Sequence, residues 1–283
     1  MLDQKLLQEV WEDFEDTNKP LLQTGFQDLD VILGLYGNKG RLVTIGARPA
    51  MGKTTFMLSI AEKLLEKNKK VLLYSLEMSD KQMIKKLLLM TSEVESAKVR
   101  LKQLSASDYE TLARNMDKIS EWDLYIDDTP GITVDQIEKR IKEVKPEIVF
   151  IDYLQLMSGD KKKDRYSQIE DICLNLKRIA KENGLIIFMA SQLSRALESR
   201  YDKRPLLSDL RESGAIENIS DIVIFLYREK YYNYRDEDDE LRTKGETEVI
   251  VAKNKFGCCG TVHITFSAKI PKFYDRSNHF GIF

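Results

Sequence analysis

The sequence has 283 residues, a net charge of −2, and hydrophobic and charged shares of 42% and 32%, values typical of a globular domain. This balance excludes a disordered chain and a surface that is basic all over, so any contact with nucleic acid must be local. The apolar runs at residues 185–190 and 222–227 are far shorter than the about 18 residues that a membrane helix needs. The acidic and amide-rich start differs from a signal peptide, and the three cysteines lack the C-x-x-C spacing of a zinc site. We therefore expect a cytoplasmic protein without a membrane segment, a disulfide framework or a zinc centre.

The first 17 residues contain one apolar stripe at helical spacing. Its members are Leu6, Leu7, Val10, Trp11 and Phe14. Two interpretations of this amphipathic helix are open: it packs on its own domain, or it docks on a neighbouring copy of the chain. We favour docking, because exposing the stripe on a lone domain would forgo about 1.5 to 3 kcal/mol for each Leu or Phe that could be buried.

From residue 41 onward, short apolar runs alternate with amphipathic helical segments. The predicted buried strands are residues 42–46, 71–76, 124–127, 148–152, 185–191 and 222–226. Residues 54–66 and 166–182 are examples of the helical segments between them. This alternation predicts an α/β fold with an open, mostly parallel sheet flanked by helices. Residues 248–253 and 261–266 are separated by a short Gly-flanked turn and are expected to form an antiparallel C-terminal hairpin at the sheet edge.

A phosphate-binding loop is predicted between the first strand and the first of these helices. Its sequence is Ala47-Arg48-Pro49-Ala50-Met51-Gly52-Lys53-Thr54-Thr55, of which residues 48–55 are assigned to nucleotide binding. The backbone N–H groups of such a loop and the positive end of the following helix bind phosphates. We expect Lys53 to hold the β- and γ-phosphates of ATP, and the Thr54 hydroxyl to bind Mg²⁺. The first Gly of the usual pattern is Ala47 here, with Gly46 just before it.

Polar residues follow three of the predicted strands. Asp152 ends one of them and is expected to hold Mg²⁺ through a water, the alternative being a helix or turn cap. Glu77 ends another, and it is not needed as a helix cap because residues 79–82 form a capping box of their own. Its carboxylate could accept a proton from an attacking water; the alternative is a surface glutamate. Gln192 could hydrogen-bond the γ-phosphate, the alternative being a polar strand end.

Five ordered motifs resemble those of the DnaB-type replicative DNA helicases, whose ATPase domain is RecA-like. They are RPAMGKT (residues 48–54), LEMS (76–79), DYLQLM (152–157), SQLSR (191–195) and SDLRESGAIE (208–217). Upstream, residues 24–30 are similar to the start of that domain. The resemblance runs from about residue 21 to residue 274, and five ordered motifs are far more specific than a phosphate loop alone.

The resemblance implies an ATP- and Mg²⁺-dependent helicase that translocates on single-stranded DNA and unwinds duplex DNA. The family forms ring hexamers with ATP at subunit boundaries and single-stranded DNA through the centre, and Glu77 corresponds to its catalytic base. By the same resemblance, residues 1–20 are the end of a linker helix and residues 21–283 are the ATPase domain. A helicase loader or primase is the further partner that the family suggests.

The family's two DNA-binding loops correspond to two stretches of this chain. One follows Asp152 and includes Lys163 and Arg165, beside two further lysines at 161 and 162. The other contains Arg211, Glu212 and Gly214. Such loops grip phosphates through Arg side chains and backbone N–H groups without reading bases. For the lysine run, a solvated loop is the alternative.

Four more residues correspond to nucleotide contacts of the family. Arg228 matches a position against the nucleotide base, and Phe266 is expected on the other face of that base. Lys253 and Lys255, which strand alternation puts on one face, match two residues that reach the γ-phosphate of a neighbouring subunit. The second of these is usually Arg, and Lys keeps the charge but loses the bidentate fork. The alternative for Lys255 is an exposed turn residue.

Two other functions remain open beside a helicase motor. One is a recombination or repair ATPase with the same RecA-like core, against which stand the helicase forms of residues 76–79 and 209–216. The other is a non-motor ATP-binding assembly module. Lys255, and Leu174 where the family often has Arg, are the departures that keep this alternative open.

Overall fold

A computed structural model of the chain describes residues 3–5, 7, 8, 11, 22–35, 40–210, 213–232 and 245–276. Its centre is one sheet of nine strands: β1 Arg41–Ala47, β2 Val71–Ser75, β3 Leu124–Asp127, β4 Ile148–Asp152, β5 Ile186–Gln192, β6 Ile222–Tyr227, β7 Glu246–Asn254, β8 Gly260–Ser267 and β9 Lys272–Asp275. The order across the sheet is β3-β2-β4-β5-β1-β6-β7-β8-β9. The first six strands in this order are parallel, and each of the last three is antiparallel to the strand before it.

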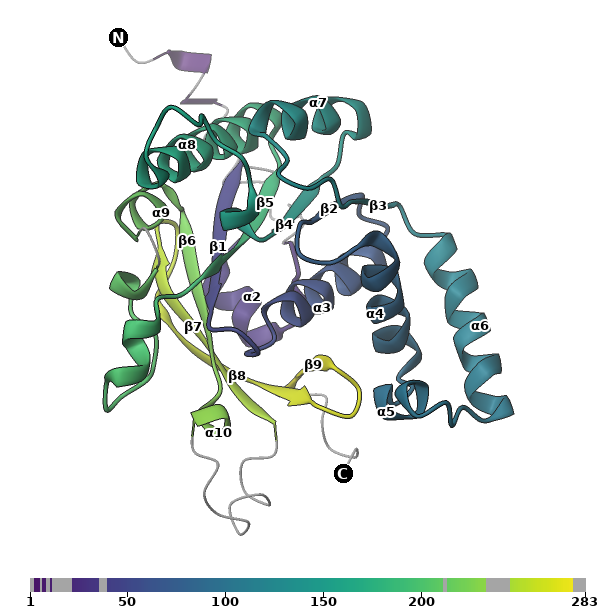
Figure 1. Ribbon diagram of the computed structural model, residues 1–283. Helices are drawn as coiled ribbons and strands as arrows, with labels where there is room; N and C mark the ends of the chain where they lie inside the picture. Colours follow the sequence, from purple (N-terminus) through teal and green to yellow (C-terminus); the bar gives the residue numbers. More distant parts are fainter. Residues whose placement is uncertain are drawn as a thin grey trace.

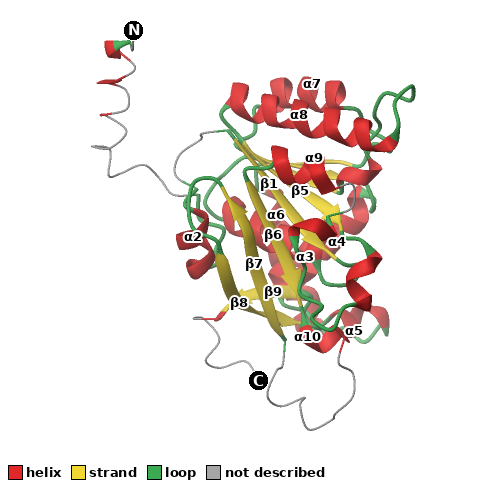
Figure 2. Cartoon of the chain, turned by 90° about the vertical axis from the view of Figure 1, so that its left-hand side faces the viewer, coloured by secondary structure: helices red, strands yellow, loops and turns green. Residues whose placement is uncertain are grey.

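Helices cover both faces of this sheet (Figure 1, Figure 2). The helices are α2 Gln27–Leu33, α3 Lys53–Leu65, α4 Asp80–Ser92, α5 Ser96–Arg100, α6 Ala106–Ser120, α7 Val134–Val144, α8 Arg165–Asn183, α9 Ser213–Ile219 and α10 Glu229–Tyr232. Short 3-10 turns are η1 Leu154–Leu156, η2 Arg195–Ser199 and η3 Leu207–Asp209. Of the helices in these described ranges, none is both long enough and apolar enough to cross a membrane.

The predicted fold class is confirmed, and all eight predicted strands are present with bounds that shift by at most two residues. The structure adds β9, which the sequence did not predict because its four residues contain only one strongly apolar side chain, Phe273. The antiparallel edge therefore has three strands instead of a hairpin alone. The capping box at Ser79 is also confirmed: its side chain accepts from the Gln82 N–H, and Gln82 reaches back to the Ser79 N–H.

Apolar side chains fill both faces of the sheet, because successive residues of a strand point to opposite sides. In β4, Ile148 and Phe150 join a cluster with α2, α3 and α4. Val149 and Ile151 point the other way and join a cluster with α7, α8 and α9, which lie together on one side in Figure 2. Burial on both faces explains why the strands are continuous apolar runs.

The first predicted helix lies mostly outside the described residues. Leu6, Val10 and Phe14 fall in that part of the chain. The described Leu7 and Trp11 are 52% and 63% exposed, so neither is buried in the core of this domain. Docking of the stripe on a neighbouring copy, and the division of the chain at residue 20, stay predictions.

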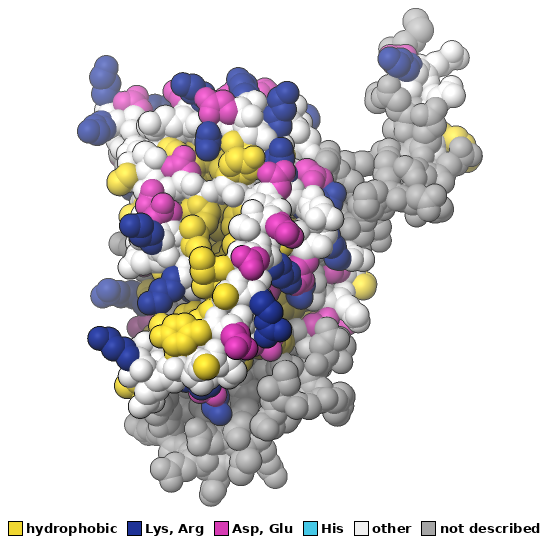
Figure 3. Space-filling view, turned by 90° about the vertical axis from the view of Figure 1, so that its right-hand side faces the viewer, with side chains coloured by type: hydrophobic (Ala, Val, Ile, Leu, Met, Phe, Trp, Pro, Cys, Tyr) yellow, Lys and Arg dark blue, Asp and Glu magenta, His cyan; other side chains and the backbone are white. Residues whose placement is uncertain are grey.

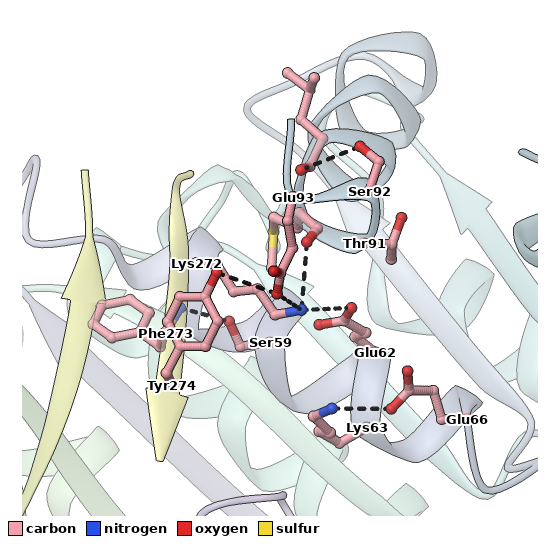
Figure 4. Close-up of polar contacts among 12 residues, drawn as sticks. Ser59, Glu62, Lys63, Glu66, Thr91, Ser92, Glu93, Lys272, Phe273 and Tyr274 are labelled. Atoms are coloured by element: carbon pink, nitrogen blue, oxygen red, sulfur yellow. Dashed lines mark hydrogen bonds and ion pairs between the residues drawn. The ribbon is translucent and has the colours of Figure 1, made fainter. Parts of the chain in front are cut away.

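A buried ion pair holds β9 against α3 and the last turn of α4 (Figure 4). The Lys272 ammonium lies 2.9 Å from Glu62 Oε1 and donates to the Met90 carbonyl at 3.4 Å. The Lys272 and Glu62 side chains are 9% and 2% exposed. Within the described ranges, Glu62 Oε2 has no hydrogen-bond partner, so Lys272 is the cation that compensates a carboxylate almost cut off from water. The next residue, Phe273, donates its backbone N–H to Ser59 Oγ at 3.2 Å, which adds a second link to α3.

We expect Lys272→Met to lower the free energy of unfolding by about 3 to 5 kcal/mol, because it leaves the Glu62 carboxylate buried without a cation. The double variant Lys272→Met with Glu62→Leu should recover most of this loss, since it removes both charges together. Urea unfolding of the wild type and the two variants, followed by circular dichroism, measures the difference. Equal losses in the single and double variants would show that packing of Lys272, and not its charge, stabilises β9.

Candidate active site

The predicted phosphate loop connects β1 to α3 at the carboxyl end of the parallel strands (Figure 1). Gly52 caps α3 at a φ of 95°, in the left-handed region that favours glycine. A Cβ at this position would lie 3.0 Å from the Phe273 ring, so β9 packs directly behind the loop. The loop leads directly into the N-terminus of α3. The backbone N–H groups there and the positive end of the helix dipole favour the binding of an anion.

Three other strand ends lie beside this loop in the order β2-β4-β5-β1. Asp152 pairs in register with Ser75, and Gln192 pairs with Ala47. Together with side chains from α4 and β8, the loop borders one pocket. The residues that line it are Ala47, Arg48, Pro49, Ala50, Gly52, Lys53, Thr54, Thr55, Glu77, Lys86, Tyr153, Gln192 and Phe266. Most of the nucleotide-site residues predicted from the sequence thus meet in this pocket. The exceptions are Met51, which is buried in the core, and Arg228, which does not line the pocket.

Lys53 is the first residue of α3 and reaches toward β4. Its ammonium lies 4.0 Å from Asp152 Oδ1 and 4.4 Å from the centroid of the Tyr153 ring. Burial lowers the pKa of Lys53, while the carboxylates of Asp152 and Glu77 act against that lowering. A largely buried ammonium with only a distant ion-pair partner is well suited to bind the oxygens of a phosphate.

Thr54 and Asp152 form the cradle in which Mg²⁺ fits. The Thr54 hydroxyl donates to Asp152 Oδ2 at 2.5 Å. Asp152 Oδ1 is buried and, in the described part of the chain, has no hydrogen-bond partner. Mg²⁺ typically takes only one or two protein ligands and completes its octahedron with phosphates and water, so this pair is sufficient. The described residues hold no group of three or more His, Cys, Asp or Glu side chains that could bind a metal without such help.

Glu77 lies exposed at the pocket rim, two residues beyond β2 and before α4. Lys86 of α4 reaches the same pocket and was not predicted from the sequence. Burial lowers the pKa of Lys86, and the carboxylates of Asp152 and Glu77 again oppose that lowering. The sequence contained a signal for Lys86. It lies at helical spacing among Met83, Leu87 and Met90, which are all buried, and a lysine on the buried face of a helix points to a function for its ammonium group.

Gln192 is fixed by a second glutamine. Its backbone N–H donates to Gln155 Oε1 at 3.2 Å, and Gln155 Nε2 donates to Ser191 Oγ at 3.0 Å. Gln155 lies in η1, just after Asp152, so the ends of β4 and β5 are tied together at the pocket. These bonds fix the backbone at Gln192, whose side chain lines the pocket, and its contact with a γ-phosphate stays a prediction.

Arg48 lines the pocket, yet its guanidinium is bound elsewhere. Nε and Nη2 donate to Glu198 Oε1 at 2.9 and 2.7 Å, and Nη1 donates to the Leu193 carbonyl at 2.9 Å. These contacts give Arg48 a second neighbour besides the predicted nucleotide, namely the segment that follows β5.

Arg228 and Phe266, which are predicted to lie on opposite faces of a nucleotide base, are in direct contact with each other. The Arg228 guanidinium lies 4.1 Å from the centroid of the Phe266 ring, and burial lowers its pKa. A base that stacked between the two would displace the guanidinium from this face of the ring. The Phe266 and Phe273 rings are 4.9 Å apart, so together they form an aromatic wall behind the phosphate loop.

Lys253 and Lys255 lie outside this pocket. β7 is antiparallel to β6, and Lys253 pairs with Val223, near the start of β6. Lys253 and Lys255 therefore lie at the amino ends of the parallel strands, whereas Lys53 lies at their carboxyl ends. Both ammonium groups donate to the Asn218 carbonyl at the end of α9, each at 3.3 Å, so they share one side as predicted. Lys255 also lies 3.8 Å from Asp221. Neither can serve the phosphate loop of its own chain from this position.

The DNA-binding candidates are only partly described. Arg211 and Glu212 lie outside the described residues, and Gly214 is half-buried in the first turn of α9. Lys163 pairs with Asp171 at 2.6 Å, and Arg165 donates to the Gln155 carbonyl at 2.9 Å. These two cations are therefore engaged within the chain, and DNA phosphates would have to compete with those contacts.

Comparison with known proteins gives concordant results. The family model described as DnaB-like helicase C terminal domain matches residues 22–275. The chain is 38% identical over 266 residues to replicative DNA helicase DnaB of Geobacillus stearothermophilus, covering 92% of this chain and 57% of that relative. Replicative DNA helicase DnaB of Helicobacter pylori is 37% identical over 289 residues, with 90% and 59% covered. The chain thus spans less than two thirds of the length of these relatives.

Two solved structures resemble the fold closely. The ATPase domain of G40P gives a TM-score of 0.89 at 36% identity, covering 96% of this chain and 98% of that one. A DnaB-like replicative helicase, described together with its interactions with primase, gives a TM-score of 0.89 at 35% identity, covering 97% and 68%. The resemblance of the five sequence motifs is therefore confirmed over the whole described domain.

We expect Glu77→Gln to lower kcat for ATP hydrolysis by about 10² to 10⁴-fold with little change in ATP affinity, because the amide keeps the shape but cannot accept the proton. Lys53→Ala should instead weaken ATP binding, because it removes the cation next to the phosphates. Steady-state ATPase rates and titration with a fluorescent ATP analogue separate the two effects. A Gln variant with near wild-type turnover would remove Glu77 from the role of base.

Lys86→Met should lower kcat by roughly 10²-fold, the typical effect of losing one polar group that stabilises developing charge. Lys86→Arg should retain more of the activity, since it keeps the positive charge. The adjacent, exposed Lys85 offers a matched control, and Lys85→Met should leave the rate unchanged. Equal rates for the two methionine variants would exclude Lys86 from the reaction.

Proposed function

The chain belongs to the family of DnaB-like helicase C-terminal domains, and on that premise we propose that it is the motor of a replicative DNA helicase. In this proposal, ATP hydrolysis drives translocation on single-stranded DNA and unwinding of duplex DNA. The observation that carries the proposal is the meeting of Lys53, Glu77 and Gln192 in a single pocket around the phosphate loop. Asp152 lies beside it, hydrogen-bonded to Thr54 and 4.0 Å from the Lys53 ammonium. The cytoplasmic location expected from the sequence remains a prediction.

Each of these residues has one task in the proposed hydrolysis. Lys53 and the N-terminus of α3 bind the β- and γ-phosphates, and Lys86 adds positive charge from the side of α4. Thr54 and Asp152 hold Mg²⁺, which when bound neutralises charge on the phosphates. Glu77 takes a proton from the attacking water. Gln192 hydrogen-bonds the γ-phosphate and so distinguishes ATP from ADP.

We infer that the active form is a ring, in which Lys253 and Lys255 act on the ATP of the neighbouring subunit. Their position at the edge of the sheet opposite Lys53 supports this, since they cannot reach their own phosphate loop. A hexamer is the form that the family suggests.

The N-terminal stripe is the proposed contact to the next subunit. Its described members Leu7 and Trp11 are largely exposed. An exposed apolar surface lies on the side formed by α4, α5 and α6, where Figure 3 shows hydrophobic side chains gathered in a band. Exposed members of that surface are Ile84, Leu101, Tyr109 and Met116. A docked helix would cover this surface and remove both apolar faces from water.

Single-stranded DNA is the proposed polymer substrate, held by loops near the N-termini of α8 and α9. These two N-termini are adjacent, because a Cβ on Gly214 would lie 2.8 Å from the Tyr166 hydroxyl. Both candidate loops therefore converge on one area of the surface, where several subunits of a ring would form a channel. Primase is a candidate partner, since one structural neighbour is described with its interactions with primase. A helicase loader remains an expectation from the family.

The decisive experiment is an unwinding assay on a forked duplex with ATP and Mg²⁺, run beside a strand-exchange assay. We expect ATP-dependent unwinding, lost in Lys53→Ala, and no strand exchange. Single-stranded DNA should bind more tightly with a non-hydrolysed ATP analogue, and affinity should fall as salt increases, because phosphate contacts release counterions. Strand exchange without unwinding would indicate a recombination ATPase, and ATP binding without either activity would indicate an assembly module. Tight DNA binding by a proven monomer would contradict the ring.

We expect Lys255→Ala to lower the DNA-stimulated ATPase rate by at least about tenfold, since a trans-acting arginine contributes about 10³ to 10⁵ and a lysine keeps part of that effect. Lys255→Arg should match or exceed the wild type. Mixing Lys255→Ala with Lys53→Ala subunits should restore part of the rate, because some interfaces then combine an intact phosphate loop with an intact Lys255. The control partner is the double variant Lys53→Ala with Lys255→Ala, which should restore nothing. Full activity of Lys255→Ala alone would leave this residue with no part in hydrolysis.

A further inference from the structure

Arg48 connects the phosphate loop to a segment outside the pocket. Its side chain is buried, with 8% exposed, and the three hydrogen bonds that it makes with described residues go to the segment that follows β5. Two of these bonds converge on one carboxylate oxygen of Glu198, in η2, and the third goes to the carbonyl of Leu193. A charge-assisted contact of this kind fixes direction as well as distance, because the guanidinium is planar.

The segment that Arg48 grips is closed on itself. Leu193 and Leu210 form an antiparallel bridge, and the Ser194 N–H donates to the Asp209 carbonyl at 2.8 Å. The Arg200 guanidinium donates to the Asp209 carboxylate at 2.6 Å, which adds a tie inside the loop. The two ends of the segment are therefore tied to each other. One end follows Gln192 directly, and the other directly precedes Arg211 in the sequence.

We propose that Arg48 and Glu198 form a positioning pair that couples nucleotide binding to DNA binding. Arg48 holds the closed segment 193–210 against the phosphate loop, so a change at the phosphates is transmitted to both ends of that segment. Glu198 does not line the pocket in the described residues, and it acts only through Arg48. This inference rests on the proposed function, since it concerns the coupling between two ligands of that motor.

Coupling of this kind has a thermodynamic signature. If ATP tightens DNA binding by some factor, DNA must tighten ATP binding by the same factor, and typical factors are about 5 to 150-fold. A pair that only stabilised the fold would change the melting temperature and leave that factor alone. A pair that positions the segment changes the factor and leaves each ligand's own affinity nearly intact.

The test uses Glu198→Ala, because Glu198 is 45% exposed and does not line the pocket. Single-stranded DNA affinity is measured with and without a non-hydrolysed ATP analogue, and analogue affinity with and without DNA. We expect the coupling factor to fall by at least about fivefold in both directions, with basal ATPase and analogue affinity within about twofold of the wild type. Glu198→Gln, which keeps the acceptor oxygen but loses the charge, should retain part of the coupling.

Two controls make the result specific. Glu248→Ala breaks the contact by which Arg204 ties the same segment to β7, with bonds of 2.8 and 2.6 Å, and it should leave the coupling factor unchanged. In the Arg48→Met background, Glu198→Ala should have no further effect, since the pair is already broken. The proposal is overturned if the wild type shows coupling and Glu198→Ala retains it fully, or if Glu248→Ala reduces it equally. Absence of coupling in the wild type would instead contradict the proposed helicase function.

Discussion

The site depends on one constraint of topology: β2, β4, β5 and β1 are parallel neighbours, so their carboxyl ends lie along one edge of the sheet. Each end carries one of the residues proposed for the chemistry, although these residues are far apart in the sequence. The phosphate loop follows β1, Glu77 follows β2, and Asp152 and Gln192 end β4 and β5. Hydrogen bonds between the strands fix the register of these ends, as with Ala47 beside Gln192. A ligand at this edge therefore contacts four segments whose mutual positions are set by the core and not by flexible loops.

The three antiparallel strands alternate in direction, so they place side chains at both ends of the parallel strands. β7 runs toward the edge away from the phosphate loop and brings Lys253 there. β8 returns to the phosphate edge and places Phe266 in the pocket. β9 then sets Phe273 against Gly52, and the buried pair of Lys272 and Glu62 fastens this strand to α3. Thus a single short region provides an aromatic wall for its own nucleotide site and the cations proposed for the site of its neighbour.

The sequence predicted the fold and most of the pocket because the relevant signals are local. Apolar runs buried on both faces mark parallel strands, and polar residues at their ends mark the ligand edge. Lys86 was missed because a lysine on a helix normally lies at the surface, and only its place in the stripe of Met83 and Leu87 distinguishes it. The second attachment of Arg48 could not be predicted, since Glu198 is 150 positions away and no local pattern relates the two residues. Strand β9 has too little apolar periodicity to be recognised in the sequence. It is held by the buried ion pair of Lys272 and Glu62, which no local sequence pattern predicts.

The balance of charge in the pocket bears on the proposed assembly. Lys53 and Lys86 both interact with the carboxylates of Asp152 and Glu77, and Arg48 is paired with Glu198. The three positive and three negative charges of these residues cancel. Apart from the partial charge of the α3 dipole, only Mg²⁺ would then offset the negative charge of a triphosphate, and it offsets only part of that charge. Two lysines from a neighbouring subunit would supply the missing positive charge at the interface between subunits. Water is excluded from such an interface, so the dielectric constant is low and charges interact more strongly. A lysine at position 255 meets this electrostatic need as well as an arginine would, and it gives up only the planar fork. Lysine in place of the family's usual arginine at position 255 is therefore compatible with a motor. The electrostatic stabilisation of the phosphates is kept, and only the orienting effect of the planar guanidinium is lost.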